Sequence, residues 1–257
     1  MKNKLRLAST VVVLVATGCG QPQESSLEIV GGSKVAANSI ITSHTVALVS
    51  PTGKSFCTGT LVSPSHVVTA GHCLAGYDEK ALYVAFGPVA KPGYFARERL
   101  RWGVTAKVHQ GFDLSNAEQF PATKPINDIA MIKLNEPAPK GFTPAPVLTG
   151  KDQLKVGETL VLAGFGLTHF LWGSSGVLRQ VSTKVESVNR KSKEFDFAAS
   201  NGRSACSGDS GGPAFVLRGK SLVLVGVTSR GSSRCNSTGT YTDFRPFSPW
   251  VNAFLAD

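Results

Sequence analysis

The segment Cys206-Ser207-Gly208-Asp209-Ser210-Gly211-Gly212-Pro213 surrounds one serine with glycines. Glycine permits backbone angles that other residues avoid and lets a substrate approach the main chain closely. This setting favours a nucleophilic serine, which needs a general base beside it and a third group to orient that base. Because the serine lies late in the chain, its position limits where these partners can be.

The order of residues along the chain excludes two arrangements of such a triad. The Gly-x-Ser-x-Gly pattern also occurs in α/β-hydrolases, in which the histidine follows the serine. The chain has five histidines: His44, His66, His72, His109 and His169. None of them follows Ser210. An order of Asp, His, Ser with His72 also fails, because the first aspartate is Asp78. The remaining order for His72 is His, Asp, Ser.

Among the histidines, His72 has the most distinctive setting. It lies in Val67-Val68-Thr69-Ala70-Gly71-His72-Cys73, where an apolar strand ends in small residues and a cysteine can fix the backbone beside the imidazole. The other four histidines are interpreted as structural or exposed. Between His72 and Ser210, only Asp128 opens an apolar, buried-looking strand. A carboxylate there can be desolvated and still bond to an imidazole, which fixes the tautomer of the ring.

Three segments together resemble the signatures of the trypsin and chymotrypsin family of serine proteases. They are Thr69-Ala70-Gly71-His72-Cys73, Asn127-Asp128-Ile129-Ala130 and Gly208-Asp209-Ser210-Gly211-Gly212-Pro213. Ile29-Val30-Gly31-Gly32 is similar to the N-terminus that activation cleavage exposes in that family. Leu162-Ala163-Gly164-Phe165-Gly166 is similar to its mid-chain Gly-aromatic-Gly segment. The resemblance runs from Ile29 to the C-terminus. It implies an all-β fold of two six-stranded antiparallel β-barrels packed together, with the site between them.

The resemblance also implies a role for each matching position. Ser210 attacks a peptide carbonyl, His72 takes its proton and returns it to the leaving amine, and Asp128 orients His72. The backbone N–H groups of Gly208 and Ser210 form the oxyanion hole. The implied disulfides are Cys57 with Cys73 and Cys206 with Cys235.

Activation by cleavage is a further implication of the resemblance. A free amine on Ile29 would turn inward and pair with Asp209, which would order the serine loop. The intact precursor is then expected to be inactive. Because Glu28 stands where the family often has Arg or Lys, we do not expect a trypsin-like enzyme to activate itself here.

Three positions are expected to form the specificity pocket. Ser204 matches the pocket base, where a trypsin-like enzyme carries Asp, and Gly231 and Gly239 match the pocket walls. This pattern favours a large apolar side chain, aromatic or Leu-like, on the acyl side of the cut. Two arginines leave a rival open, because Arg230, where the family commonly has Trp, or Arg234 could instead favour acidic side chains.

The composition agrees with a turn-rich β fold. The 257 residues include 27 Gly and 14 Pro, and only 17% are charged. These values argue against a coiled coil, a helical bundle or a highly charged disordered chain. About twelve short apolar or alternating runs lie between residues 45 and 244, which favours a sandwich or barrel. Only residues 248–255 look helical. The Pro-rich stretch 137–146 would divide the domain into halves of about 29–140 and 141–257.

Residues 1–28 have the pattern of an export signal followed by a short propeptide. Lys2, Lys4 and Arg6 precede an apolar run that ends in small residues. Cys19 lies where a bacterial lipoprotein signal places its lipid-bearing cysteine, and its lipidation would leave four cysteines for disulfides. The alternative is that Cys19 is an incidental residue of a discarded peptide. We expect an exported protein, periplasmic or held at the outer membrane through Cys19, which cleavage after Glu28 would release.

The net charge of +10 is interpreted as a solvated basic surface, because aromatic and basic residues do not alternate as in nucleic-acid binding proteins. We expect polypeptide substrates, an activating protease, no nucleic-acid partner and a monomer. No His or Cys cluster has metal-ligand spacing, so neither metal nor cofactor is expected. Two alternatives stay open. One is a non-catalytic homologue that binds anionic polymers, and the other is a small-ester hydrolase that uses the same serine.

Overall fold

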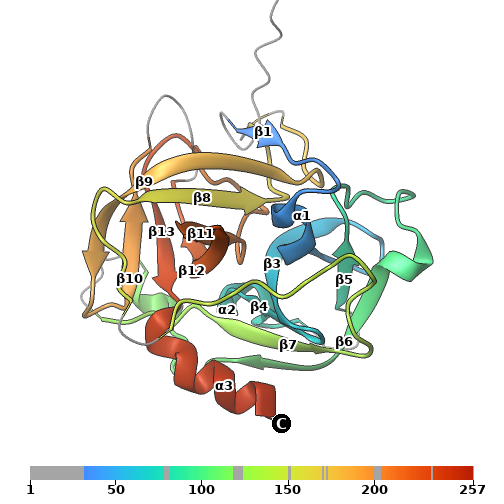
Figure 1. Cartoon of the computed structure of the whole chain (residues 1–257), viewed down its shortest axis with the longest axis horizontal. Helices are drawn as coiled ribbons and strands as arrows, with labels where there is room; N and C mark the ends of the chain where they lie inside the picture. The colour runs from blue at the N-terminus through green and yellow to red at the C-terminus, as the bar shows by residue number, and fades with distance from the viewer. Residues whose placement is uncertain are drawn as a thin grey trace, which may run out of the picture.

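The computed structural model describes residues 32–77, 82–117, 124–149, 152–169, 171, 173–199, 204–232 and 234–256. These residues form two β-barrels that lie side by side (Figure 1). The connection from β7 (Ala130–Leu134) to β8 (Thr159–Gly164) leads from the first barrel to the second, and the Pro-rich stretch 137–146 lies within it. None of the helices in these ranges has the length and apolar character needed to cross a membrane.

The first barrel has six antiparallel strands in the order β2-β3-β4-β7-β6-β5, and pairing of β5 with β2 closes it. The strands before β7 are β2 (Thr45–Val49), β3 (Ser55–Ser63), β4 (His66–Thr69), β5 (Tyr83–Phe86) and β6 (Leu100–Val108). Apolar side chains that suit a pleated surface fill its interior, and Val67, Val68 and Ile132 have no exposed surface.

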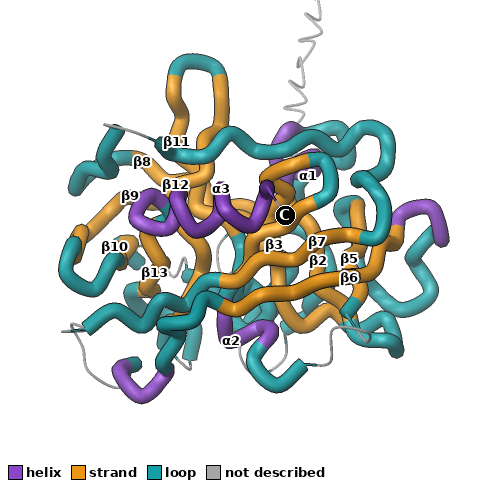
Figure 2. Tube along the Cα trace, turned by 90° about the horizontal axis from the view of Figure 1, so that it is seen from below, coloured by secondary structure: helices purple, strands orange, loops and turns teal. Residues whose placement is uncertain are grey.

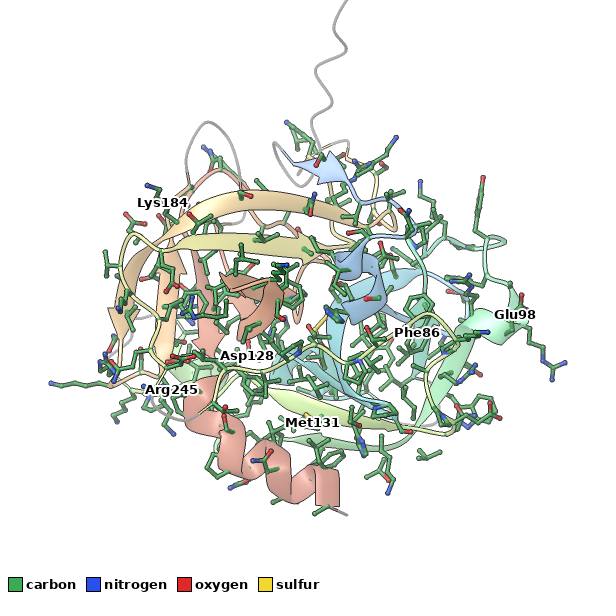
Figure 3. All side chains as sticks on the ribbon, in the orientation of Figure 1. Phe86, Glu98, Asp128, Met131, Lys184 and Arg245 are labelled. Carbon is green, nitrogen blue, oxygen red and sulfur yellow. A yellow bond between two sulfur atoms is a disulfide. The ribbon has the colours of Figure 1, made fainter. Side chains whose placement is uncertain are left out.

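The second barrel is built in the same way. Its strands after β8 are β9 (Arg179–Asn189), β10 (Glu194–Phe197), β11 (Pro213–Arg218), β12 (Ser221–Arg230) and β13 (Gly239–Asp243). Pairing of β8 with β9 closes the barrel, and the short strand β1 (Ser33–Lys34) adds to β9. Along β9, Val181 and Val185 are buried while Lys184 points to solvent (Figure 3), as the two-residue period of a strand requires. The predicted fold of two six-stranded antiparallel barrels is confirmed.

Helices occupy the connections and the C-terminus. The α-helices are α1 (Ile40–His44), α2 (Gly71–Leu74) and α3 (Ser248–Ala256), and the 3-10 helices are η2 (Arg97–Arg99), η3 (Leu114–Asn116) and η4 (Arg245–Phe247). The sequence predicted α3 but not α1 or α2, because one turn is too short to display a helical period. In Figures 1 and 2, α3 lies against the outside of the barrels. Its residues Val251 and Phe254 are buried in a core cluster with first-barrel residues.

An apolar interface and two disulfides hold the barrels around the site. Phe215 and Leu224 of the second barrel belong to the same buried cluster as Leu61 and Met131 of the first. Both expected disulfides, Cys57–Cys73 and Cys206–Cys235, are formed. The segments that carry the candidate site residues are therefore fixed to two packed barrels.

Candidate active site

The buried carboxylate of Asp128 holds His72. Asp128 has no exposed surface and lies near the centre of the molecule, just before β7 (Figure 3). Its Oδ2 lies 2.7 Å from the imidazole Nδ1 of His72, and its Oδ1 accepts the backbone N–H of His72 at 2.9 Å. The side chain of His72 is still 25% exposed. The carboxylate thus fixes the orientation of a ring that is partly open to solvent.

The backbone around Asp128 is fixed by its neighbours. Asn127 has a φ of 50°, a region that Asn tolerates better than most residues. Its side-chain amide donates to the carbonyl of Gly111 at 2.7 Å. Thr242 of β13 donates its hydroxyl to the carbonyl of Asp128 at 2.9 Å. The backbone just before β7 is therefore held by Gly111 and by Thr242 of the second barrel.

The one-turn helix α2 places His72. A Cβ on Gly71 would lie 3.0 Å from the Phe112 ring, so a small residue is needed directly before His72. On its other side, the Cys57–Cys73 disulfide ties the helix to β3. Small residues and the disulfide together hold this turn close to the barrel.

Ser229 is a contact of the site that the sequence analysis missed. This buried serine at the end of β12 donates its hydroxyl to Asp128 Oδ2 at 2.7 Å. The same oxygen atom faces His72, so Ser229 helps to hold the acid that orients the imidazole. The available signal was the pair Thr228-Ser229, which is polar although it ends an apolar strand. Such a pair is also compatible with ordinary strand ends, so it does not by itself indicate a site.

Ser210 lies in the loop before β11, and this loop packs against the first barrel. Gly211 has a φ of 79°, and a Cβ there would overlap Thr69 Oγ1 and the carbonyl oxygen of Thr58. The carbonyl of Ser210 accepts the N–H of Thr58 at 2.8 Å. The serine loop therefore meets the end of the strand that leads into His72.

In the described structure, the hydrogen bonds of His72 go to Asp128, and none joins its ring to the Ser210 hydroxyl. Catalytic hydrogen bonds are often long or poorly aligned before a substrate binds.

Two backbone N–H groups beside Ser210 have no protein acceptor among the described residues. They belong to Gly208, whose φ is 96°, and to Ser210 itself. The neighbouring peptide groups are bonded: the carbonyl of Ser207 accepts the N–H of Leu167 at 2.9 Å, and the N–H of Gly211 donates to Thr228 at 2.8 Å. The two N–H groups are therefore available as donors to a ligand oxygen beside Ser210.

Asp209 is buried next to these donors. Its Oδ1 accepts the N–H of Gly166 and its Oδ2 accepts the N–H of Cys206, each at 2.8 Å. Burial raises the pKa of Asp209 to about 6, against the opposing effects of these two N–H groups and of the Arg179 charge. Ile29, its expected partner, lies outside the described residues.

A cavity of about 160 Å³ adjoins Ser210. The serine loop and the end of β12 line it, with Thr228, Arg230 and Gly231 among the lining residues. Ser204, the expected pocket base, is fully buried and donates its hydroxyl to the carbonyl of Ser237 at 3.0 Å.

The two expected pocket glycines face each other. A Cβ on Gly231 would lie 3.8 Å from the Cα of Gly239. A Cβ on Gly239 would overlap the ring of Phe197, so close packing of that ring already requires a glycine there.

Comparison with known proteins shows the family. A sequence profile of the Trypsin family matches residues 29–251. The chain belongs to the trypsin family. It is 30% identical over 247 residues to a chymotrypsin of Phaedon cochleariae, an alignment that covers 90% of this chain and 84% of that protein. It is 28% identical over 213 residues to trypsin epsilon of Drosophila erecta, with 77% of each chain covered. The protein is thus a serine protease of the chymotrypsin fold.

Within this protease, the two arginines that could favour an acidic substrate lie in different settings. The guanidinium of Arg230 bonds both carboxylate oxygens of Glu194, at 2.6 and 3.1 Å. Glu194 is buried, so the charge that Arg230 brings to the cavity is balanced. Arg234 is exposed and is not among the cavity's lining residues.

The contacts described for the remaining histidines of the protease are to residues outside the serine loop. His44 contacts the carbonyl of Thr143, and His66 and His109 pack edge-on against aromatic rings. Burial lowers the pKa of all three, with nearby lysine charges adding to the effect at His66 and His109. Nδ1 of the fourth, His169, accepts the N–H of Leu171 at 3.3 Å.

Across the described ranges, one group of side chains is close enough together to hold a metal ion, formed by Cys57, His72 and Cys73. The two cysteines are joined in a disulfide, so their sulfur atoms are not thiolate ligands.

Proposed function

We propose that this trypsin-family protein is an endopeptidase that uses Ser210, His72 and Asp128. The observation that carries the proposal is the buried Asp128, which is bonded to His72 while the Ser210 loop packs against the strand that leads into His72. Nδ1–H of His72 would donate to the carboxylate, leaving Nε2 to take the proton of the Ser210 hydroxyl. Asp128 would stabilise the imidazolium that forms.

The backbone would stabilise the reaction's tetrahedral intermediate. As Ser210 Oγ attacks the peptide carbonyl, negative charge develops on the carbonyl oxygen. The N–H groups of Gly208 and Ser210, which lack an acceptor among the described residues, would donate to this oxygen. Each such donor can contribute about 3 kcal/mol, because the charge develops only in the transition state. His72 would then protonate the leaving amine, and water would hydrolyse the acyl-enzyme.

Covalent labelling tests this proposal directly. A fluorophosphonate should add one adduct to the activated protein at Ser210, and intact mass should show no adduct on Ser210→Ala. Peptide hydrolysis by Ser210→Ala should fall by roughly a thousandfold or more. An activated wild-type chain that folds but neither labels nor hydrolyses peptides would favour the non-catalytic binding homologue. Hydrolysis of small esters alone would favour the esterase.

Activation would follow cleavage between Glu28 and Ile29. The carboxyl group of Asp209 is buried, and its raised pKa reflects the cost of charging it there. An ammonium group on Ile29 would balance this charge and hold the serine loop, as the family resemblance implies. N-terminal sequencing of the active enzyme should begin at Ile29. Active enzyme whose N-terminus still lies upstream would contradict this step.

The substrate side chain on the acyl side of the cut is proposed to be large and apolar. Ser204 supplies no charge at the expected pocket base, and Glu194 balances Arg230 at the cavity. Peptides that differ only in this residue should be cleaved best with Phe or Leu. Preference for Glu or Arg would reject the proposal without affecting the proposed triad.

The precursor is also proposed to be exported and to be attached to the membrane through a lipid on Cys19. The two disulfides fit an oxidising compartment. Metabolic labelling with palmitate should mark the precursor and not its Cys19→Ala variant. Cleavage after Glu28 should release an unlabelled protease from the membrane fraction.

A further inference from the structure

Thr58 of β3 reaches across from the first barrel to the serine loop. It is fully buried. Its N–H donates to the carbonyl of Ser210 and its hydroxyl donates to the carbonyl of Gly208, both at 2.8 Å. The same hydroxyl accepts the N–H of Phe165 at 3.1 Å. Thr58 thus bonds the carbonyl of Gly208 through its side chain and the carbonyl of Ser210 through its backbone.

The bond from the Thr58 hydroxyl restricts the Gly208–Asp209 peptide, which links the two peptides that carry the Gly208 and Ser210 N–H groups. A peptide group is planar, so fixing the carbonyl of one peptide fixes the N–H at its other end. The peptide before Gly208 is held through the Ser207 carbonyl, which accepts the N–H of Leu167. The peptide after Gly208 is held at its carbonyl by the Thr58 hydroxyl and at its N–H by the carbonyl of Cys206, 2.9 Å away. Without the hydroxyl, rotation of the second peptide is opposed at one end only.

Thr58 also contacts the histidine side of the site. Its carbonyl accepts the hydroxyl of Thr69 at 2.8 Å, and Thr69 ends the strand before α2. The neighbouring residue Cys57 is bonded to Cys73, which directly follows His72. The same short segment of β3 therefore contacts both the serine loop and the segment that carries His72.

We infer that Thr58 is a positioning residue for the oxyanion donors, acting through its hydroxyl on the Gly208–Asp209 peptide that links the two peptides carrying them. This inference rests on the proposed function of the Gly208 and Ser210 N–H groups. A fixed donor stabilises developing charge without having to reorient during the reaction. Loss of the hydroxyl should therefore lower kcat and leave KM little changed, because the donors act on the transition state more than on the bound substrate.

Three variants separate this role from ordinary burial. Thr58→Val keeps the shape and removes the hydroxyl. Thr58→Ser keeps the hydroxyl and removes a methyl group that lies 3.2 Å from where a Cβ on Gly212 would be. Thr60→Val is the matched control, since Thr60 lies two residues along the same strand and is fully buried. Within the described structure its hydroxyl has no hydrogen-bond partner.

The measurement is kcat per active site on a peptide substrate, with sites counted by a titrant that acylates Ser210. For Thr58→Val we expect kcat to fall roughly 10- to 100-fold, less than the 10²–10³-fold typical of losing a donor outright, with KM within about twofold. The kcat of Thr58→Ser should lie within about threefold of wild type, and the kcat of Thr60→Val should equal that of wild type. A Thr58→Val enzyme that melts earlier but keeps kcat per titrated site would overturn the inference.

Hydrogen exchange gives a second test that needs no catalysis. Amide exchange over residues 204–212 and at Phe165 should be faster in Thr58→Val than in wild type, Thr58→Ser or Thr60→Val. If the wild type is inactive, the proposed function fails, and exchange still decides whether the hydroxyl holds the loop. Unchanged exchange in Thr58→Val would reject that restraint even in an active enzyme.

Discussion

Arg230 and Glu194 form a two-point ion pair between β12 and β10, with Nη1 and Nη2 at 2.6 and 3.1 Å from the two carboxylate oxygens. Two N–H groups of one guanidinium match the geometry of a carboxylate, so the pair fixes the orientation of the Arg230 side chain as well as neutralising its charge. The arginine lines the cavity beside Ser210, and the glutamate is buried and is not among the lining residues. The positive charge of Arg230 at the cavity is therefore balanced by Glu194.

Removing this partner should change the substrate preference. Glu194→Gln leaves the positive charge of Arg230 unbalanced at the cavity. The ratio of kcat/KM for a Glu peptide over the matched Leu peptide should then rise roughly tenfold, equivalent to about 1.4 kcal/mol.

Two further variants identify the source of this charge effect. Glu194→Gln combined with Arg230→Gln should return the ratio to the wild-type value. Arg234→Gln, which alters an exposed arginine near the cavity, should leave it unchanged. An unaltered ratio in Glu194→Gln would show that the ion pair does not set the preference.

Loss of the Ser229 hydroxyl should slow catalysis. Ser229→Ala removes one of the donors that hold Asp128 against His72. Since a hydrogen bond to a charged group is worth about 1.5–3 kcal/mol, kcat should fall roughly tenfold or more, with KM little changed. Ser221→Ala, at the exposed start of the same strand, serves as the control and should behave as wild type. Equal kcat in both variants would argue against a positioning role.

Asp209 should make the stability of the precursor depend on pH. Burial raises its pKa in the folded chain to about 6 from an ordinary 3.8, so the folded precursor binds this proton more tightly than the unfolded chain. The resulting stabilisation is complete below about pH 3.8 and is lost as the pH rises through about 6. Its full size is about 3 kcal/mol.

Urea unfolding of the Ser210→Ala precursor, with and without Asp209→Asn, isolates this contribution. Relative to the Asp209→Asn variant, the free energy of unfolding of the protein with Asp209 should fall as the pH rises from about 4 to about 7. After cleavage at Ile29, pairing with the new ammonium group should lower the pKa and reverse the trend. A difference that is constant with pH in the precursor would contradict the assigned burial effect.

Gly211 and Gly219 provide a matched pair for the packing of the serine loop. Both have positive φ, 79° and 61°, so alanine is strained at either position. A Cβ on Gly219 meets nothing within 4 Å, whereas one on Gly211 overlaps Thr69 and Thr58. Gly219→Ala should cost about 1–2 kcal/mol of unfolding free energy, and Gly211→Ala about 2–3 kcal/mol more because of overpacking. Thermal unfolding of the two variants measures the difference, and equal costs would mean that the loop yields freely.

Local patterns predicted the strands well and the short helices poorly. Along β9, alternation of buried Val181 and Val185 with exposed Lys184 is visible in the sequence because neighbouring side chains face opposite sides of a strand. The turns α1 and α2 have no such periodic signal. Capping by Ser39 at α1 and the close packing of Phe112, which leaves little room for a Cβ at Gly71, at α2 fix them instead. The second of these contacts joins residues that are distant in the chain.

The sequence by itself determined the strand pattern and the motifs, because both are properties of neighbouring residues. The two-barrel fold and the disulfide pairs followed from the resemblance of those motifs to the trypsin family. The sequence also named His72, Asp128 and Ser210 as candidates through their motifs and their order. Only the tertiary structure decided that Ser229 contacts Asp128, that Thr58 bonds the serine loop and that Glu194 balances Arg230. Each of these contacts joins strands or loops that are far apart in the chain. Their distances and angles therefore depend on how the two barrels pack.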